Sequence, residues 1–592
     1  MQTLTAGYYD YRLESGESPF RASLRIERES EGVEIVHIRI EADAPAVPPA
    51  FTLAWNPPIV DASAMWHPTA NFAKGLRADW SQAFDSKSTH SAPVISLFGG
   101  SGKNRLTFAF SDVLNVIRFN AGVHEETATF SCLVSMFDTP TTPLARYEAE
   151  LRIDVRDIPY YDCLADVSRW WASYPSNAPA PVPSAALEPM YSTWYSFHQH
   201  LNPAEVEEQC RLARELGCDS VIVDDGWQTA DNARGYAYCG DWNVCADKIP
   251  DMRAHVARVH ALGMNYLLWY SVPFIGIHSE AWSRFENKML ERVDRLNTGV
   301  VDPRYPEVRE YLIGIYEKAL LEWDLDGFKL DFVDAFEQPA VERDDADPGR
   351  DTPSVAQAVD MLLSEVIARL RAVKPDIMIE FRQSYISPLM RKYGNLFRAG
   401  DVPNDALQNR VHTIDVRLLC GNTAAHSDMI MWHPGEPADA AALQLINILF
   451  AVPQISVRLD TLPQDHKDMT AFWLRFWREH RDTLMNGYLE PHHPELNYPL
   501  VTARSEHAFI AAAYHDTVVA LDGDLPVTII LVNGTRGSRL IAEAAENIGP
   551  RSVRVLDCCG REIAAYELDG LQGLKAFDVP ASGLVILQTS QS

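Results

Sequence analysis

The sequence predicts a multidomain protein in which a (β/α)₈ barrel, the TIM-barrel fold, lies between an N-terminal β-sandwich and a C-terminal antiparallel β-domain. Near both ends of the chain, apolar and polar residues alternate with a period of two, which is typical of half-buried strands. In the middle of the chain, strand-like runs alternate with helical stretches, which favours an α/β fold. A length of 592 residues is also too great for one hydrophobic core.

The two β-domains are predicted from short alternating segments that turn residues separate. Segments 33–40 and 147–153 are examples, and they place an N-terminal β-sandwich over residues 1–175. A proline-rich stretch follows and is expected to be extended, so residues 176–188 are predicted to be a linker. Alternating strands return towards the C-terminus, and residues 501–592 are predicted to form the small antiparallel β-domain.

Residues 189–500 are predicted to form the barrel, because eight candidate strands are separated by helical connectors. The helix that follows the first strand illustrates the pattern: Asn202 is a good N-cap, Pro203 suits the first helical position, and Gly217 should end the helix. A doubly wound open sheet is the alternative, but no glycine-rich phosphate loop follows any strand. The candidate strands are 189–195, 219–224, 264–270, 327–331, 376–381, 396–401, 428–432 and 453–457.

Composition and charge argue against several classes of partner. The formal net charge of −29 repels phosphate backbones and anionic lipids, so we expect neither a nucleic-acid nor a membrane-surface partner. No apolar run approaches the length of a membrane span, and the first residues lack a signal-peptide pattern, so a cytoplasmic protein is expected. The nine cysteines show no metal-ligand spacing, so neither a zinc site nor a disulfide framework is indicated.

Charged and aromatic residues gather at the C-terminal ends of the candidate strands, where a barrel carries its chemistry. The clearest case is Asp331, because a buried charge needs a partner and period-two alternation places Lys329 on the same side of the strand. A structural ion pair would also explain this one strand. However, acids, bases or tryptophans recur at the same end of six strands, and this recurrence favours a functional site. These ends are Asp224-Asp225-Gly226-Trp227, Trp269-Tyr270, Lys329-Leu330-Asp331, Glu380-Phe381-Arg382, Arg398-Ala399-Gly400-Asp401 and Trp432-His433.

These residue types suit a neutral ligand with many hydroxyl groups. One carboxylate of a pair can protonate a departing glycosidic oxygen while another stabilises the oxocarbenium-like centre. Adjacent carboxylates such as Asp224 and Asp225 suit vicinal hydroxyls, and tryptophan suits the apolar face of a sugar. Each motif alone also has a structural interpretation, since Asp-Asp-Gly is often only a turn. Together they indicate a carbohydrate site.

The barrel region resembles glycoside hydrolase family 36 of clan D, the α-galactosidase or melibiase family, and the flanking β-domains match that family's arrangement. The ordered set of motifs is fairly specific, although no single motif is. In chain order the matching motifs are Asp224-Asp225-Gly226-Trp227, Gly240-Asp241-Trp242, Lys248-Ile249-Pro250, His260-Ala261-Leu262-Gly263-Met264 with Leu268-Trp269, residues 302–309 and residues 326–331.

The resemblance implies a retaining α-glycosidase, most of all an α-galactosidase, that acts on a small oligosaccharide or glycoside without a metal or organic cofactor. It makes Asp331 the nucleophile and Asp401 the acid/base, with Asp405 as the fallback. Retention requires the two carboxyl groups to lie about 5–5.5 Å apart. We expect Lys329 to keep Asp331 charged, and burial and negative neighbours to keep a proton on Asp401. The residues expected to bind substrate are Asp224, Asp225, Trp227, Trp269, Lys329, Arg398, Arg382 and Trp432.

Departures from the family pattern surround the sugar and leave its identity open. The usual Lys-Trp-Asp-Met-Asn-Arg is here residues 329–334, Lys-Leu-Asp-Phe-Val-Asp, and a Cys- and Gly-rich stretch is replaced by residues 380–385. Glu380, Arg382 and His433 are therefore candidate pocket residues special to this chain, with structural roles as the alternative. The alternative functions are an α-glycosidase for another sugar, a raffinose-type transglycosylase and a non-catalytic carbohydrate-binding protein. A homo-oligomer is also open, because family relatives are often assembled.

Overall fold

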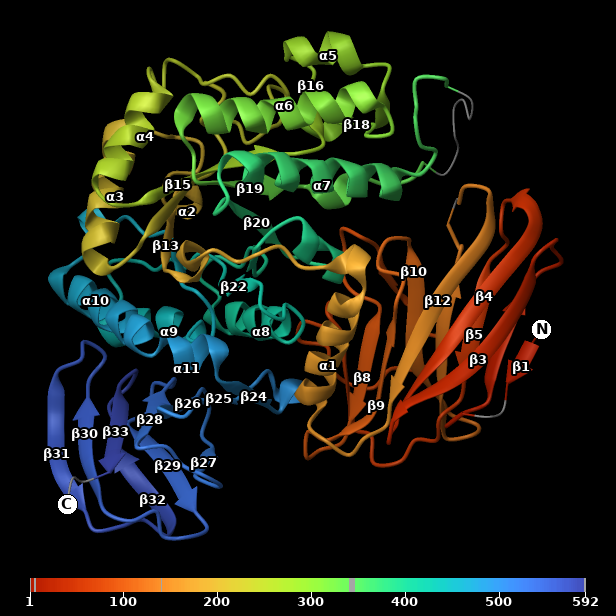
Figure 1. Cartoon of the computed structure of the whole chain (residues 1–592). Helices are drawn as coiled ribbons and strands as arrows, with labels where there is room; N and C mark the ends of the chain where they lie inside the picture. Colours follow the sequence, from red (N-terminus) through yellow and green to blue (C-terminus); the bar gives the residue numbers. More distant parts are fainter. Residues whose placement is uncertain (1, 5–6, 140, 340–346, 590–592) are drawn as a thin grey trace.

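The computed structural model describes residues 2–4, 7–139, 141–339 and 347–589. Three parts follow one another along the chain (Figure 1): a red-to-orange β-sandwich, a yellow-to-cyan barrel with its helices, and a blue β-domain. The predicted fold class is confirmed. No helix of the described residues is long and apolar enough to cross a membrane.

Eight parallel strands form the barrel, in the order β22-β21-β20-β19-β15-β14-β13-β23. Parallel bridges from His426 to Val452 and from Ile430 to Ile455 connect the first and last strands of this order. The barrel is therefore nearly closed, and the alternative of an open doubly wound sheet is wrong. The strands are β13 (Met190–Ser192), β14 (Ser220–Val223), β15 (Asn265–Ser271), β19 (Gly327–Asp331), β20 (Met378–Arg382), β21 (Leu396–Arg398), β22 (Ala424–His426) and β23 (Gln454–Ile455).

The seventh strand is the one that the sequence misplaced. It was predicted over 428–432, whereas β22 is Ala424–His426 and the later segment follows the strand. Small residues make up most of β22, while Met429-Ile430-Met431-Trp432 is more apolar and looked more strand-like. Tertiary pairing with β21 overrides this local preference. The first charged residue after the seventh strand is therefore Asp428, and Trp432 lies further along the loop.

Helices surround the barrel, and their ends follow the expected chemistry. The α3 helix begins after Asn202, whose Oδ1 accepts hydrogen bonds from the N–H groups of Ala204 and Glu205. It ends at Gly217, whose φ of 105° is in the left-handed region that favours glycine. The principal helices of this part are α3 (Pro203–Leu216), α4 (Met252–Ala261), α6 (Pro306–Trp323), α7 (Val355–Val373), α8 (Ala406–Arg417), α9 (Ala438–Asn447) and α10 (Gln464–Glu479).

The interior of the barrel changes from apolar to charged along the strands. Its lower layer is a buried apolar cluster that includes Met190, Ile222, Leu267, Met378, Leu396 and Ala424. Because side chains on one face of a strand recur every second residue, the next inward positions are Ser192, Asp224, Trp269, Glu380, Arg398 and His426. The apolar layer thus supports a charged layer at the C-terminal ends of the strands.

The N-terminal sandwich consists of two six-stranded sheets that enclose a separate apolar core. Helix α1 (Tyr160–Ser173) lies between this sandwich and the barrel (Figure 1), and the sequence analysis did not predict it. The first sheet contains β1 (Gln2–Leu4), β2 (Tyr11–Ser15), β5 (Phe51–Trp55), β11 (Thr129–Met136), β10 (Ile117–His124) and β7 (Phe84–Ser86). The second contains β3 (Arg21–Ser30), β4 (Val33–Ala46), β12 (Leu144–Asp154), β9 (Asn104–Phe110), β8 (Val94–Phe98) and β6 (Ala64–Trp66).

The C-terminal domain combines a seven-stranded and a three-stranded sheet. Most pairs are antiparallel, but β26 pairs in parallel with β28 and β27 with β29. The larger sheet contains β24 (Tyr488–His492), β25 (Leu500–Arg504), β26 (Ala508–Ala513), β28 (Thr528–Asn533), β33 (Leu584–Thr589), β30 (Arg551–Leu556) and β31 (Glu562–Leu568). The smaller sheet contains β27 (Val518–Ala520), β29 (Arg539–Ala544) and β32 (Gly573–Asp578).

The buried carboxylate of Asp415 ties these parts together. It lies in α8 and accepts hydrogen bonds from Trp66 Nε1 at 2.9 Å and from the Tyr498 hydroxyl. Lys74 Nζ of the sandwich lies 3.1 Å from its other oxygen. Because α8 directly follows the loop after β21, these contacts from the sandwich and from the segment after the barrel fix one side of the barrel mouth.

Candidate active site

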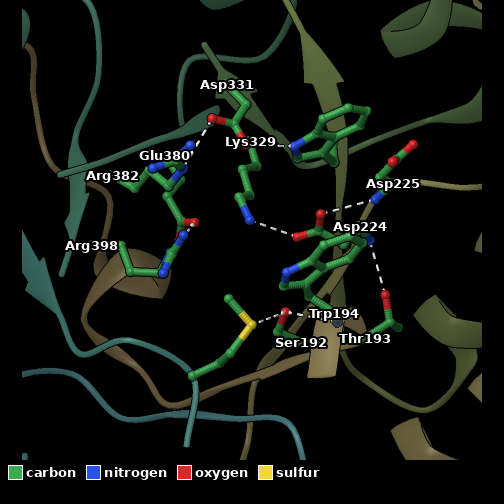
Figure 2. A network of polar contacts seen from close by, with 12 residues as sticks. Ser192, Thr193, Trp194, Asp224, Asp225, Lys329, Asp331, Glu380, Arg382 and Arg398 are labelled. Carbon is green, nitrogen blue, oxygen red and sulfur yellow. Dashed lines mark hydrogen bonds and ion pairs between the residues drawn. The ribbon is translucent and has the colours of Figure 1, made fainter. Parts of the chain in front are cut away.

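Asp331 ends strand β19 with its two carboxylate oxygens in different surroundings (Figure 2). Its Oδ1 accepts hydrogen bonds from Phe332 N at 2.8 Å, from Arg382 Nε at 3.0 Å and from the Tyr385 hydroxyl. In the described part of the chain, its Oδ2 accepts a bond from Trp269 Nε1 alone, at 3.0 Å. Only 8% of the side chain is exposed. Oδ2 is therefore the oxygen with a lone pair left to react.

The positive charges beside Asp331 keep it ionised. Burial acts to raise the pKa of Asp331, but the charges of Arg382 and Lys329 outweigh it and hold the pKa below its ordinary value. The expectation that Lys329 keeps this carboxylate charged is consistent with that shift, although Lys329 makes its own hydrogen bond elsewhere. A buried, ionised carboxylate with one accessible oxygen is suited to act as a nucleophile.

Lys329 forms a buried ion pair with Asp224 across the barrel (Figure 2). Its Nζ lies 2.6 Å from Asp224 Oδ2, and the backbone N–H of Asp225 donates to Asp224 Oδ1 at 2.9 Å. Thr193 Oγ accepts from the Asp224 N–H at 2.9 Å and so fixes the turn after β14. The pair offers an ammonium donor and a carboxylate acceptor side by side, which suits adjacent hydroxyl groups of a sugar.

Asp225 is held by two glutamine side chains. Its oxygens accept from Gln199 Nε2 at 2.6 Å and from Gln228 Nε2 at 2.7 Å. The next residue, Gly226, has a φ of 111°, and a Cβ there would lie 2.5 Å from Gln199 Cα, so the close approach of these chains requires glycine. Burial raises the pKa of Asp225 to about 6. This carboxyl group can therefore change its charge within the working range of many enzymes.

The two tryptophans predicted to line the pocket have different environments. The Trp269 indole points at Asp331, whereas the Trp227 indole donates to the backbone oxygen of Trp269 at 2.9 Å. Trp227 is fully buried and stacks on Trp242 with ring centres 5.8 Å apart. It thus supports Trp269 from behind. Trp194, which the sequence analysis did not single out, lies beside Asp224 at the mouth (Figure 2).

Arg398 is a fully buried cation that joins three carboxylates at the ends of different strands. Its guanidinium contacts Asp401 Oδ1 at 2.8 Å and Glu380 Oε1 at 3.4 Å, and it pairs with Asp428 Oδ1. The other Glu380 oxygen accepts from Gln454 Nε2 at 2.5 Å. Glu380 is completely buried, and burial raises its pKa. Glu380 is therefore a partner of Arg398 and Gln454 in the charged layer.

Asp401 and Asp405 differ in their surroundings, although both follow β21. Asp401 is bonded to Arg398, and 41% of its side chain is exposed at the mouth. Asp405 is an exposed N-cap of α8, and its Oδ1 accepts the N–H of Gln408 at 2.9 Å. A capping carboxylate explains Asp405 as a structural residue. The geometry therefore favours Asp401 as the functional group.

The expected protonation of Asp401 is not met in this ligand-free arrangement. Burial acts to raise the pKa of Asp401, but Arg398 and Lys329 outweigh it and lower the pKa below its ordinary value. Arg382 adds to this effect. The sequence predicted that negative neighbours would dominate, because strand positions alone do not show that the cations converge on this carboxylate.

Asp428 is the site residue that the sequence analysis missed. It is fully buried, and its Oδ2 accepts from Val402 N at 2.7 Å and from the Tyr195 hydroxyl at 2.9 Å, while its Oδ1 pairs with Arg398. The misplaced seventh strand hid it. The signal that could have found it is an acidic residue directly after the short, mostly small-residue run Ala424-Ala425-His426-Ser427. Asp428 holds both Arg398 and the backbone next to Asp401.

Replacing Asp428 with asparagine should change how stability depends on pH. Burial raises the pKa of Asp428 from 3.8 to about 7, although Arg398 opposes the shift. Between these values the folded protein binds more protons at this site than the unfolded chain, so the free energy of unfolding falls as pH rises from about 4 to about 7. Asp428→Asn should make this decrease in the free energy of unfolding less steep, by up to about 1.4 kcal/mol per pH unit.

The measurement is denaturant unfolding of the wild type and Asp428→Asn at several pH values across this range. Asp405→Asn is the matched control, because it removes an exposed carboxylate from the neighbouring loop after β21 and asparagine is also a good N-cap. Parallel stability curves for the wild type and Asp428→Asn would contradict the assignment.

Trp432 and His433 are not brought into this network. Trp432 Nε1 donates to His466 Nδ1 of α10 at 3.0 Å, and His433 is exposed with its Nδ1 accepting from Gly435 N. Among the described residues, neither side chain forms a hydrogen bond or an ion pair with the charged layer. They were chosen because the seventh strand was placed too late. The described residues also contain no group of three or more His, Cys, Asp or Glu side chains that could hold a metal ion.

Comparison with known sequences identifies relatives of the barrel. Residues 186–384 match the family described as Melibiase. The α-galactosidase AgaA of Geobacillus stearothermophilus is 26% identical over 151 residues, which are 23% of this chain and 20% of that protein. The α-galactosidase of Escherichia coli is 27% identical over 158 residues, which are 26% of this chain and 22% of that protein. The matched stretches thus span about a fifth of the length of these curated relatives.

Comparison with solved structures extends the likeness to nearly the whole chain. A variant of AgaA from Geobacillus stearothermophilus in complex with raffinose has a TM-score of 0.62 and 14% identity, and the match covers 98% of this chain and 86% of that one. The galactosidase domain of the α-galactosidase-sucrose kinase AgaSK has a TM-score of 0.63 and 13% identity, with 98% and 85% covered. At these identities the likeness shows the fold.

Proposed function

We propose, from the premise that residues 186–384 belong to the melibiase family, that this chain is a retaining α-galactosidase that hydrolyses terminal α-linked galactose from small oligosaccharides or glycosides. The observation that carries the proposal is the buried, ionised Asp331 with Oδ2 left to react, at the same end of the barrel as the exposed carboxylate of Asp401. Lys329 and Arg382 influence the pKa of both Asp331 and Asp401, so both carboxylates lie within reach of the same cations. The named activities of the relatives support the choice of sugar.

In the first step, Asp331 Oδ2 forms a bond to the anomeric carbon while the bond from that carbon to the leaving oxygen breaks. Asp401 gives its proton to the leaving oxygen. Asp401 therefore has to gain a proton before the reaction. A bound sugar excludes water from its exposed side and so raises its pKa, which opposes the effect of the surrounding cations.

In the second step, the covalent glycosyl-enzyme is hydrolysed. Asp401, now ionised, takes a proton from water as the water oxygen bonds to the anomeric carbon. The bond between that carbon and Asp331 Oδ2 breaks, and its electron pair returns to the carboxylate. Two displacements at one carbon retain its configuration, so the released sugar is the α-anomer.

Recognition of the terminal sugar is assigned to the charged layer at the C-terminal ends of the strands. Lys329 and Asp224 present a donor and an acceptor to adjacent hydroxyls. Trp194 lies beside Asp224 (Figure 2), and Trp269, which donates to Asp331, provides a second aromatic surface. Related solved structures in complex with raffinose and stachyose support α-galactosyl oligosaccharides as the substrate class. The departures at residues 380–385 lie close to Asp331, so a different terminal sugar is the alternative that a substrate screen must address.

The test is a screen of nitrophenyl α-glycosides combined with mass detection of a trapped glycosyl-enzyme. We expect the α-galactoside to be cleaved fastest, the first sugar product to be the α-anomer by NMR, and a fluorinated α-galactosyl inactivator to label the peptide that carries Asp331. Preference for another α-glycoside would replace galactose as the substrate. Sugar binding without cleavage of any glycoside would replace the enzyme by a carbohydrate-binding protein, and net transfer to an added sugar acceptor would indicate a transglycosylase.

A further inference from the structure

An arginine is bonded to the proposed nucleophile, in the segment that replaces the Cys- and Gly-rich stretch of the family's usual sequence. Arg382 ends strand β20, and its Nε donates to Asp331 Oδ1 at 3.0 Å. The Tyr385 hydroxyl and the Phe332 N–H donate to the same oxygen. Three donors on Oδ1 and a single donor on Oδ2 make the carboxylate asymmetric before any substrate binds.

The Arg382 guanidinium is held firmly in this position. It lies over the ring of Phe332 at 5.5 Å and over the ring of Tyr385 at 5.1 Å from the ring centres. Its Nη1 also donates to the backbone oxygen of Gln383 at 3.0 Å. Aromatic faces attract a cation, and a backbone oxygen satisfies a second N–H, so these contacts keep the guanidinium against the nucleophile.

We propose that Arg382 is a positioning residue that directs Asp331 to react through Oδ2 and promotes its release from the glycosyl-enzyme, so that the covalent intermediate does not accumulate. This inference rests on the proposed function, because it assigns a role within the two-step reaction. It differs from the sequence-based expectation that Arg382 binds substrate.

The physical reason is the change of charge on Asp331 during the reaction. The carboxylate loses its negative charge when Oδ2 bonds to the anomeric carbon, and it regains that charge when the same bond breaks. A cation bonded to Oδ1 stabilises the charged carboxylate more than the neutral ester. Arg382 therefore opposes formation of the ester and favours its hydrolysis, since only interactions that are stronger in a transition state than in the preceding state accelerate that step.

Substitution of Arg382 by glutamine should consequently affect the two steps differently. With an aryl α-galactoside that has a good leaving group, hydrolysis of the intermediate should slow by about 10- to 100-fold, the effect of losing one hydrogen bond to a charged group. The step that forms the intermediate should not be slowed by this loss, because Arg382 opposes formation of the ester. We therefore expect kcat and KM to fall together, kcat/KM to change little, and the fraction of glycosyl-enzyme at steady state to rise.

The experiment is rapid-mixing kinetics of phenolate release, with mass detection of the glycosyl-enzyme in samples quenched during turnover. Wild type and Arg382→Gln are compared, and Arg382→Lys should recover part of the effect because it keeps the charge. Tyr385→Phe removes a neighbouring donor to Oδ1, so it should shift the partition in the same direction by a smaller factor. It also tests the idea if Arg382→Gln fails to fold.

The outcomes separate this inference from the proposed function. A higher KM, a lower kcat/KM and no accumulated intermediate would make Arg382 a substrate-binding residue and overturn the inference. Unchanged partition in both Arg382→Gln and Tyr385→Phe would overturn it as well. If the wild type cleaves no α-glycoside at all, the proposed function fails, whereas normal wild-type turnover with unchanged variants leaves the function intact and rejects only the role of Arg382.

Discussion

Asp331→Asn should lower kcat/KM for aryl α-galactosides by at least about 10⁴-fold, because an amide cannot form the covalent intermediate. The substitution is nearly isosteric, and an amide oxygen in place of Oδ1 still accepts from Phe332 N, whereas an amide nitrogen in place of Oδ2 cannot accept from Trp269 Nε1. Steady-state kinetics with a good leaving group provides the measurement. The choice of leaving group matters, since it makes the reaction depend on the nucleophile more than on the acid.

Two controls make this result specific to the nucleophile. Asp334→Asn removes a half-buried carboxylate from the same loop and should keep activity within about 10-fold of the wild type, as expected of a group that touches no reacting atom. Asp331→Gly should regain activity when azide is added and should release the β-galactosyl azide, because azide attacks from the side that Asp331 had occupied. Wild-type turnover by Asp331→Asn would remove this residue from the mechanism.

Asp401→Asn should produce a loss that depends on the leaving group. With an oligosaccharide, whose leaving oxygen needs a proton, we expect kcat/KM to fall by about 10²- to 10⁴-fold. With a dinitrophenyl glycoside the first step should be nearly unaffected, because that oxygen leaves without a proton. Azide should then speed up the second step and release the α-galactosyl azide, which has the opposite configuration to the product of Asp331→Gly.

The pH dependence of kcat/KM should also report on Asp401, and its direction follows from the lowered pKa of this residue. Because Arg398 and Lys329 hold the pKa of Asp401 below its ordinary value in the free protein, the protonated fraction decreases as pH rises. For oligosaccharides, kcat/KM should therefore fall towards neutral pH, and Asp401→Asn should flatten this fall. Asp405→Asn is the matched control and should retain the wild-type profile. If Asp405→Asn instead shows the leaving-group dependence, the two carboxylates exchange roles.

Local sequence patterns were sufficient for most of the barrel strands. The strand that ends in Asp331 was predicted with its observed bounds, because a short apolar run with a period of two reads directly as a barrel strand. The helix after Asn202 was also predicted correctly from its capping residues. The same approach failed at β22, where Ala424-Ala425-His426 forms the strand only because β21 pairs with it.

By itself, the sequence determined that charged residues stand at the ends of the barrel strands. It also determined that Asp331 and Lys329 share one side of a strand. Both conclusions follow from patterns that can be read within one segment at a time. Only the tertiary structure decided which charges meet. It brought Asp428 to Arg398, Arg382 to Asp331, and Lys329 to Asp224, and it left Trp432 against α10. The physical reason is that ion pairs and pKa shifts depend on distances between strands, which closure and register set across the whole barrel.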